Sequence, residues 1–571
     1  MHAARTALAA VSFMALLAGG CSNDQAANGG PGQSQAPDMG AAAPEMTDAA
    51  ATETAPRRAG LIQGTVTDAS GHTVSGAFVK LHDTNGRLAF MVISQKDGRY
   101  TASKLPAGSY TVQAVGGDFE SAWSAPVSVS SDAAAAMDVR LDQPRAPDLP
   151  PAWPRRVPER LANLDALPAG PGKQIIAGQC AGCHSADQVV ASRYDEDTWR
   201  STVAEMKDLI AASGKPELSD ANEKILLDYL FANLAPLPAP DPNSRFPHEL
   251  MQGEALRYRV VQYNLEEKGV ETHDVAVDPW GIGWANQRTG GMISRFDPVT
   301  YEYREIGPPL YTAERARPGN LQINSEGIMW LADPFETRWL SYDIANDKWT
   351  DWPFPKDRIR GPVQGNSLVL HPDGSVWMSG HGSVRRLEPA TGEWSTWDTA
   401  SWIETHEDPG GYGITVAGDG RVWMAENLAD KLARFDGETG EVAEFQLPAG
   451  SYPRRMDHDN EGNVWVGLWG AGRILKIDYK TDEMTFIDPP VPDNGAYSID
   501  FDQSANLLWV TLQKVDVIAR YNPATEEWLM LPMPQAESDV RRIEVDQHDP
   551  RRVWWVTNSF NARIGYLELL D

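Results

Sequence analysis

The segment Cys180-Ala181-Gly182-Cys183-His184 has residue types and spacing that predict a definite chemistry. Two thiols three positions apart on a helical turn can add to the two vinyl groups of a haem, and the histidine that follows can bind the iron. A C-x-x-C pair can also form a thiol redox site or half of a zinc site. The adjoining His184 and the lack of a second cysteine pair in the sequence favour one covalent haem c, held by Cys180 and Cys183.

The sixth position of such an iron needs an apolar, weakly basic donor. Residues 198–212 predict an amphipathic helix, because apolar side chains recur every three to four positions, at Trp199, Val203, Met206 and Ile210. The pattern W-x-x-x-V-x-x-M, followed by L-S-x-x-E at Ser219 and by Y-L, resembles the small class I c-type cytochromes. That resemblance implies that Met206 is the axial ligand opposite His184, which raises the haem potential relative to two histidines. Met206 could otherwise be a core methionine, with a histidine or no residue as the sixth ligand.

The start of the chain predicts export. Arg5 precedes an apolar run at residues 7–17, which is too short to cross a bilayer of about 30 Å as a helix. Small residues then lead to Cys21, and this arrangement resembles a bacterial lipobox. The resemblance implies a signal peptide at residues 1–20, lipidation of Cys21, and a place in the periplasm or cell envelope. Plain secretion is the alternative.

Composition sets further limits. The 571 residues suggest several domains, and 50 basic against 79 acidic residues give a formal charge of −29. A chain this acidic repels phosphate backbones, so we do not expect nucleic-acid binding. Residues 21–57 hold small, polar and proline residues and no large aliphatic side chain, which predicts a disordered tether.

Residues 58–142 alternate between apolar and polar positions, with glycine-rich turns between the runs, as the short strands of a β-sandwich do. The motifs Asp97-Gly98-x-Tyr100 and Leu105-Pro106-x-Gly108-x-Tyr110 resemble the carboxypeptidase regulatory-like domain, a transthyretin-type sandwich. The resemblance implies an accessory module without catalysis. A carbohydrate-binding module is the rival interpretation, but Trp123 is the one tryptophan in the segment. A proline-rich linker at 143–168 leads to the all-α cytochrome c domain expected at 169–237.

Tryptophan recurs with a long period in the C-terminal part of the chain. The repeat runs through Trp284, Trp330, Trp377, Trp423, Trp465, Trp509 and Trp555, with gaps of 46, 47, 46, 42, 44 and 46 residues. A period of about 40–50 residues with four short strands per unit predicts a β-propeller, here of seven blades over residues 253–571. The last unit has no outer strand, so we predict that residues 257–264 supply it and close the ring. The fold class expected for the whole chain is multidomain and mainly β.

The blade containing Gly413-Ile414-Thr415, Asp419-Gly420, Trp423 and Glu426 resembles the streptogramin lyase (virginiamycin B lyase) propellers. That family's lyase is a metal-dependent carbon–oxygen eliminase with histidines and glutamates at the propeller mouth. The nearest match to its motif is Glu271-Thr272-His273-Asp274, so the resemblance implies catalytic roles for His273 and Glu271 beside a divalent metal.

Other polar residues align at the predicted mouth. Those chosen as contacts for a small anionic substrate are Arg454, Arg455, Arg541, Arg542, Tyr412 and Glu426; Asn320, Tyr497, Asp333, His381 and Gln513 align with them. Strand alternation predicts that one arginine of each pair points toward the channel and the other away. Salt bridges to Asp457 or Glu544 are the alternative role for these cations.

These features support two functions and a third without catalysis. The first is electron transfer by an exported haem protein, serving an oxidoreductase activity or a periplasmic partner docked at the propeller. The second is a metal-dependent carbon–oxygen lyase with an appended cytochrome. The third is a binding scaffold in the envelope.

Overall fold

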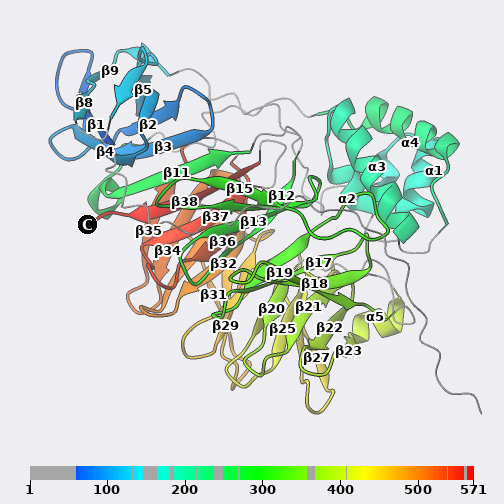
Figure 1. Cartoon of the computed structure of the whole chain (residues 1–571). Helices are drawn as coiled ribbons and strands as arrows, with labels where there is room; N and C mark the ends of the chain where they lie inside the picture. Colours follow the sequence, from blue (N-terminus) through cyan, green and yellow to red (C-terminus); the bar gives the residue numbers. More distant parts are fainter. Residues whose placement is uncertain are drawn as a thin grey trace, which may run out of the picture. The chain divides into compact units, whose positions relative to one another are not determined.

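The computed structural model describes residues 60–130, 133–145, 164–180, 186–212, 216–236, 249–265, 270–355, 367–406, 408–535, 538–557 and 562–571. The predicted signal peptide, Cys21 and the tether lie outside these residues, as do Cys183 and His184 of the haem motif. The described part is mainly β, with a short run of helices between two β regions (Figure 1). No helix in it is long and apolar enough to cross a membrane.

The first β region is a sandwich. Its longer strands are β1 (Gly60–Asp68), β2 (Phe78–Asp83), β3 (Leu88–Ile93), β4 (Arg99–Leu105) and β5 (Gly108–Gly116), and its short ones are β6 (Phe119–Glu120), β7 (Val127–Val129), β8 (Ala134–Ala136), β9 (Val139–Leu141) and β10 (Gln143–Pro144). One sheet has the order β4-β1-β8, with β9 also paired to β1, and the other contains β10-β6-β5-β2-β3. In β4 the alternation in sequence becomes alternation in burial, since Tyr100 and Ala102 are buried and their neighbours are exposed. Both sheets contribute to one hydrophobic cluster, which confirms the predicted sandwich.

Helices follow in the middle of the chain: the 3-10 turn η2 (Leu164–Ala166), then α1 (Pro171–Gly178), α2 (Ala186–Ala191), α3 (Glu196–Ala212) and α4 (Asp220–Asn233). They pack around their own cluster, which includes Ile176, Trp199 and Leu230. Ser219 caps α4 as expected, because its side chain accepts a hydrogen bond of 3.3 Å from the backbone N–H of Asn222. A Cβ on Gly172 would lie 2.2 Å from Cβ of Tyr229, so the close packing of α1 on α4 requires glycine there.

Six four-stranded antiparallel sheets, and four strands of a ten-stranded sheet shared with the sandwich, form the second β region. In chain order, the first six are β12 (Thr272–Val277), β13 (Gly283–Gln287), β14 (Met292–Phe296) and β15 (Tyr303–Ile306); β16 (Gly319–Ile323), β17 (Ile328–Asp333), β18 (Arg338–Asp343) and β19 (Lys348–Pro353); β20 (Leu368–Leu370), β21 (Val376–Gly380), β22 (Ser383–Glu388) and β23 (Glu393–Asp398); β24 (Ile414–Val416), β25 (Val422–Glu426), β26 (Lys431–Phe435) and β27 (Val442–Gln446); β28 (Pro453–His458), β29 (Val464–Leu468), β30 (Arg473–Ile477) and β31 (Met484–Ile487); and β32 (Ala496–Asp502), β33 (Leu507–Leu512), β34 (Val517–Asn522) and β35 (Glu527–Pro532). The short elements are α5 (Ala400–Thr405), η5 (Gly253–Leu256) and η7 (Gln513–Val515).

The seventh sheet closes the ring. It contains β36 (Val540–Val545), β37 (Arg552–Thr557), β38 (Arg563–Leu569) and, from before the first blade, β11 (Tyr258–Asn264). The first strands of successive sheets contact one another, and β36 contacts β12, so the sheets form a closed seven-bladed propeller. β11 pairs antiparallel with β38, with Val260 opposite Leu567, which confirms the predicted closing strand. Its other edge pairs with β3 of the sandwich (Figure 1), so neither edge of β11 is left unpaired.

The repeated tryptophan lies in the second strand of each blade, where it pairs with the inner strand. Trp284 is opposite Ala276, and Trp465 is opposite Asp457. In blade seven the equivalent residue is Trp554, which is opposite Glu544 one place before the end of β36. The choice of Trp555 from spacing was therefore wrong by one residue. Two adjacent tryptophans occupy β37, and only the pairing with β36 shows which one matches the repeat.

Candidate functional site

The candidate site lies where the inner strands of the blades begin. In each blade one residue of the inner strand pairs with the repeated tryptophan. The position three residues before it is equivalent from blade to blade, and it holds His273, Tyr412, Arg454, Tyr497 and Arg541 in blades one, four, five, six and seven. The next position in each strand holds Asp274, Asn320, Ser367, Arg455, Ser498 and Arg542. The two sets therefore bring side chains from several blades to the start of the central channel.

Arg455 joins four blades across the ring. Its Nη2 lies 2.7 Å from Oδ1 of Asp274 in blade one, and its Nη1 donates to Oγ of Ser367 in blade three at 3.1 Å. Its Nε donates to the backbone oxygen of Arg541 in blade seven at 3.2 Å. Only 1% of Arg455 is exposed. This arginine is committed to holding the inner strands together.

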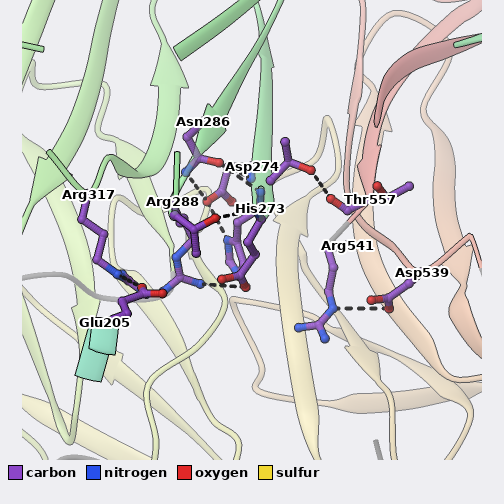
Figure 2. Close-up of polar contacts among 12 residues, drawn as sticks. Glu205, His273, Asp274, Asn286, Arg288, Arg317, Asp539, Arg541 and Thr557 are labelled. Carbon is purple, nitrogen blue, oxygen red and sulfur yellow. Dashed lines mark hydrogen bonds and ion pairs between the residues drawn. The ribbon is translucent and has the colours of Figure 1, made fainter. Parts of the chain in front are cut away.

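His273 is held inside the same network. Its Nδ1 lies 2.8 Å from Oδ2 of Asp274 and 3.3 Å from Nη2 of Arg455, and 4% of the residue is exposed. Burial, with Arg288 and Arg455 nearby, lowers the pKa of His273 to about 3, so the imidazole is neutral at physiological pH. Burial raises the pKa of Asp274, but Arg455 and His273 outweigh it, and the pKa lies below the ordinary range. Asn286 completes the network by donating to Asp274 (Figure 2).

Arg454 has aromatic neighbours instead of a carboxylate. Its guanidinium carbon lies 4.5 Å from the ring centre of Tyr412, 4.4 Å from that of Tyr452, 5.3 Å from that of Tyr497 and 5.7 Å from that of Trp469. Alternation predicts that one arginine of the 454–455 pair points toward the channel and the other away. Arg455 has partners across the ring, whereas Arg454 contacts rings of its own blade and of the adjacent blades four and six. A bulge between Pro453 and Met456 interrupts the strand pairing at this pair.

Two tyrosines connect Arg454 to Arg541. The hydroxyl groups of Tyr412 and Tyr497 are hydrogen-bonded to each other, and Nη1 of Arg541 donates to the Tyr497 hydroxyl at 3.2 Å. Burial raises the pKa of Tyr497 to about 12. Burial opposes ionisation of Tyr412 too, but Arg454, Arg455 and Arg541 outweigh it and lower the pKa of this phenol. The three arginines therefore favour the ionised form of the Tyr412 phenol itself.

The remaining predicted arginines have acidic partners. Nε of Arg541 lies 3.4 Å from Oδ1 of Asp539, and Nη2 of Arg542 lies 3.6 Å from Oε2 of Glu544. The predicted alternative of a salt bridge to Glu544 is confirmed for Arg542. Burial raises the pKa of Glu544 to about 7. Burial also raises the pKa of Asp500 well above its ordinary value, and the nearby charges of Asp457 and Glu544 raise it further.

Glu426 does not belong to this cluster. It ends β25, is fully buried, and faces the charges of Glu444, Lys431 and Asp408. Burial, followed by the charge of Glu444, raises its pKa to about 8. His381 lies nearby in the chain's third blade, with its Nδ1 2.5 Å from Oδ2 of Asp408. Glu426 is thus a neutral, buried acid between blades three and four.

Glu271 lies beside a second group of arginines. Its Oε1 is 3.9 Å from Nη1 of Arg288, whose pKa is lowered by burial and then by Arg317. Arg317 is paired with Glu205 of α3 (Figure 2). Nη2 of Arg315 lies 3.4 Å from Oδ2 of Asp208 on the same helix. In the described part of the chain no three histidine, cysteine, aspartate or glutamate residues are grouped so that they could hold a metal ion.

Several contact residues were not predicted from the sequence: Arg288, Arg317, Tyr452 and Trp469. Trp469 follows the repeated Trp465 by four positions, as Gln513 follows Trp509, so its place after a tryptophan strand was a usable signal. Arg288 and Arg317 lie in loops without a repeating pattern, and no sequence signal marked them.

Of the predicted haem ligands, Cys180 and Met206 are described. Cys180 lies two residues after the end of α1 and packs against the hydrophobic cluster of the helices. Met206 lies on α3 between Val203 and Ile210, which are both buried in that cluster, but it is itself only half-buried and is not part of the cluster. Cys183 and His184 lie outside the described residues.

Comparison with known proteins gives the following relatives. Residues 61–142 match the family model of the carboxypeptidase regulatory-like domain, as the strand motifs predicted. Virginiamycin B lyase from Staphylococcus aureus is 19% identical, with 55% of this chain and 100% of that chain covered and a TM-score of 0.47. A streptogramin B lyase structure is 20% identical, with 56% and 100% covered and a TM-score of 0.48. Hydrazine synthase from Kuenenia stuttgartiensis is 10% identical, with 51% and 94% covered and a TM-score of 0.42. Among curated proteins there is no match.

Proposed function

We propose that this chain is an electron-transfer protein of the cell envelope that carries one covalent haem c in its helical segment. In this proposal Cys180 and Cys183 hold the porphyrin through thioethers, and His184 and Met206 bind the iron, as in a small cytochrome c domain. When bound, the haem carries one electron at a time between donor and acceptor. Cys21 holds the protein at the membrane through its lipid, on the periplasmic or outer side.

The observation that carries the proposal is the placement of Met206. It continues the core face of α3, since Val203 and Ile210 lie three before and four after it and are buried. Met206 is nevertheless only half-buried and lies outside the cluster that Cys180 packs against. An apolar donor that the protein core does not enclose, in a segment that also presents the haem-binding cysteine, fits a haem iron ligand.

The contacts of α3 suggest where electrons leave or enter. Glu205, next to Met206 in sequence, pairs with Arg317 just before the inner strand β16, and about 6% of each side chain is exposed. Asp208, also on α3, pairs with Arg315, which lies two residues before Arg317. These ion pairs hold the helix with the proposed iron ligand against the face of the propeller where the inner strands begin. A substrate or partner bound at that face would therefore lie next to the haem-bearing segment.

A metal-dependent lyase ranks second. It needs His273 and Glu271 to reach a metal and a substrate together. The neutral imidazole of His273 is in the state that a ligand or base requires. Its Nδ1, however, faces Asp274 and Arg455, and Glu271 lies next to Arg288.

Haem attachment and ligation test the proposal directly. The full chain is produced with haem-attachment machinery, and we expect a Soret band that stays with the protein after acid–acetone extraction. Met206→His should lower the midpoint potential, because histidine favours the ferric iron more than methionine does. The matched control is Met484→His, which changes a half-buried methionine on β31 and should leave the potential unchanged. A mature protein that loses all haem colour on extraction would overturn the proposal.

A further inference from the structure

We propose that Arg454 is the anchoring residue of a subsite for a small organic carboxylate at the start of the propeller channel. The inference goes beyond electron transfer and holds whether or not haem is attached. It follows from the partners of the four arginines at the start of the channel, Arg454, Arg455, Arg541 and Arg542.

Three of these arginines already have a carboxylate. The nitrogen–oxygen distances are 2.7 Å for Arg455 and Asp274, 3.4 Å for Arg541 and Asp539, and 3.6 Å for Arg542 and Glu544. Arg454 makes no ion pair and donates no hydrogen bond to any group in the described ranges, and its Nε is buried without a partner. A buried charge is costly unless it is paired, so an unpaired guanidinium favours an anion brought by a ligand.

Aromatic rings surround the guanidinium of Arg454. The residue is 8% exposed and lies among the rings of Tyr412, Tyr452, Tyr497 and Trp469. Rings at these distances stabilise the cation and hold its planar fork in one orientation. Trp469 is only half-buried, and Nζ of Lys514 lies 4.7 Å from its ring centre. The aromatic contacts therefore extend from Arg454 through the half-buried Trp469 to Lys514.

Charge and shape together select the ligand class. One unpaired guanidinium matches one negative charge, and its fork binds a carboxylate with two parallel hydrogen bonds. A phosphate with two charges would need a second uncompensated cation, but Lys514 is paired with Asp493 at 2.5 Å. The rings of Tyr452 and Trp469 offer apolar contact to the body of the ligand. A monocarboxylate with a planar or apolar body fits this combination.

Calorimetric titration of the mature haem-loaded chain tests the subsite with benzoate, acetate, benzamide and inorganic phosphate as probes. We expect benzoate to bind, acetate to bind more weakly, and neutral benzamide and phosphate not to bind. Arg454→Gln should weaken benzoate at least tenfold, while Arg454→Lys retains part of the affinity. The matched control is Arg473→Gln, because Arg473 belongs to an exposed pair with Asp488 in the same blade. This variant should bind benzoate as tightly as the parent protein does.

Each other outcome contradicts the assignment. Equal affinity of the parent and Arg454→Gln for benzoate, no heat from either carboxylate, or tighter binding of phosphate would overturn it. Trp469→Leu serves as a second variant in case Arg454→Gln is unfolded by circular dichroism, and it should weaken benzoate more than acetate. Because binding heat does not depend on haem absorbance, failure of the subsite and failure of the electron-transfer proposal are distinguishable.

Discussion

At the scale of single residues, burial and partners decide the role of each polar group in the channel. Arg454 and Arg455 are neighbours in sequence and are both nine-tenths buried or more. Arg455 is neutralised by Asp274 and joins blades, whereas Arg454 is surrounded by aromatic rings. Identical side chains one position apart therefore have different partners, and only the tertiary contacts separate them.

Glu426 gives a prediction for the pH dependence of stability. Burial raises its pKa to about 8 in the folded protein, above the ordinary value of 4.5. Between these values the folded state keeps a proton that the unfolded state has lost, so stability falls as pH rises through this window. Glu426→Gln keeps a neutral side chain, and we expect it to raise the free energy of unfolding by about 4 kcal/mol at pH 8 and by about 1 kcal/mol near pH 5.

Thermal and denaturant unfolding at both pH values measure this difference. The control is Glu438→Gln in the exposed turn after β26, which should change stability little at either pH. An equal effect of Glu426→Gln at pH 5 and pH 8 would show that the buried acid does not hold its proton.

At the scale of elements, one strand completes two sheets. β11 pairs with β38 of the last blade on one side and with β3 of the sandwich on the other. Without β11 the last blade would hold only β36, β37 and β38, one strand fewer than each of the other blades. The same strand thus closes the ring and fixes the sandwich to it.

Val260 in the middle of β11 tests this closure. It is 1% exposed and packs in a cluster with residues of β3 and β36. Val260→Asp buries a carboxylate without a partner, so we expect a loss of about 3 kcal/mol or more in the free energy of unfolding. Urea unfolding followed by tryptophan fluorescence measures it. Val299→Asp, at a residue that is 76% exposed, is the control and should be nearly neutral.

At the scale of the whole molecule, the helical segment and the propeller meet through charge. Glu205 and Asp208 of α3 face Arg317 and Arg315, while the chain as a whole carries a charge of −29. Two arginines before β16 are therefore basic groups in a protein that is acidic overall, and each is paired with a carboxylate of α3. Ion pairs of this kind fix orientation more than they add stability.

Glu205→Gln should loosen this contact without disturbing the core of the helices. It leaves the buried guanidinium of Arg317 without its carboxylate. We expect amide hydrogen exchange over residues 196–212 to become several-fold faster, with an unchanged Soret band in the haem-loaded chain. Glu196→Gln breaks only the exposed pair with Arg200 on the same helix and is the control. Similar exchange in both variants would mean that the Glu205–Arg317 pair does not hold α3 in place.

The sequence by itself determined the parts that depend on local pattern. Alternation in residues 58–142 specified the sandwich, the tryptophan period specified seven blades, and the missing last strand identified residues 257–264 as the closing strand. The first two follow from periodicity, and the third follows from the strand that the last unit lacks, all of which are visible along the chain. The haem motif, the axial role of Met206 and the lipid at Cys21 remain predictions from sequence.

The tertiary structure decided which residues share a site, because their partners come from distant blades. Arg455 contacts His273 across 182 positions, and the match of Trp554 to the repeat depends on its pairing with Glu544. Arg454 and Arg455 lie at a bulge in β28 and contact different blades, which only the closed ring shows. Whether a buried charge has a partner of opposite charge depends on the groups that the closed ring brings next to it. Those groups come from other blades, so the spacing of residues within one blade cannot predict them.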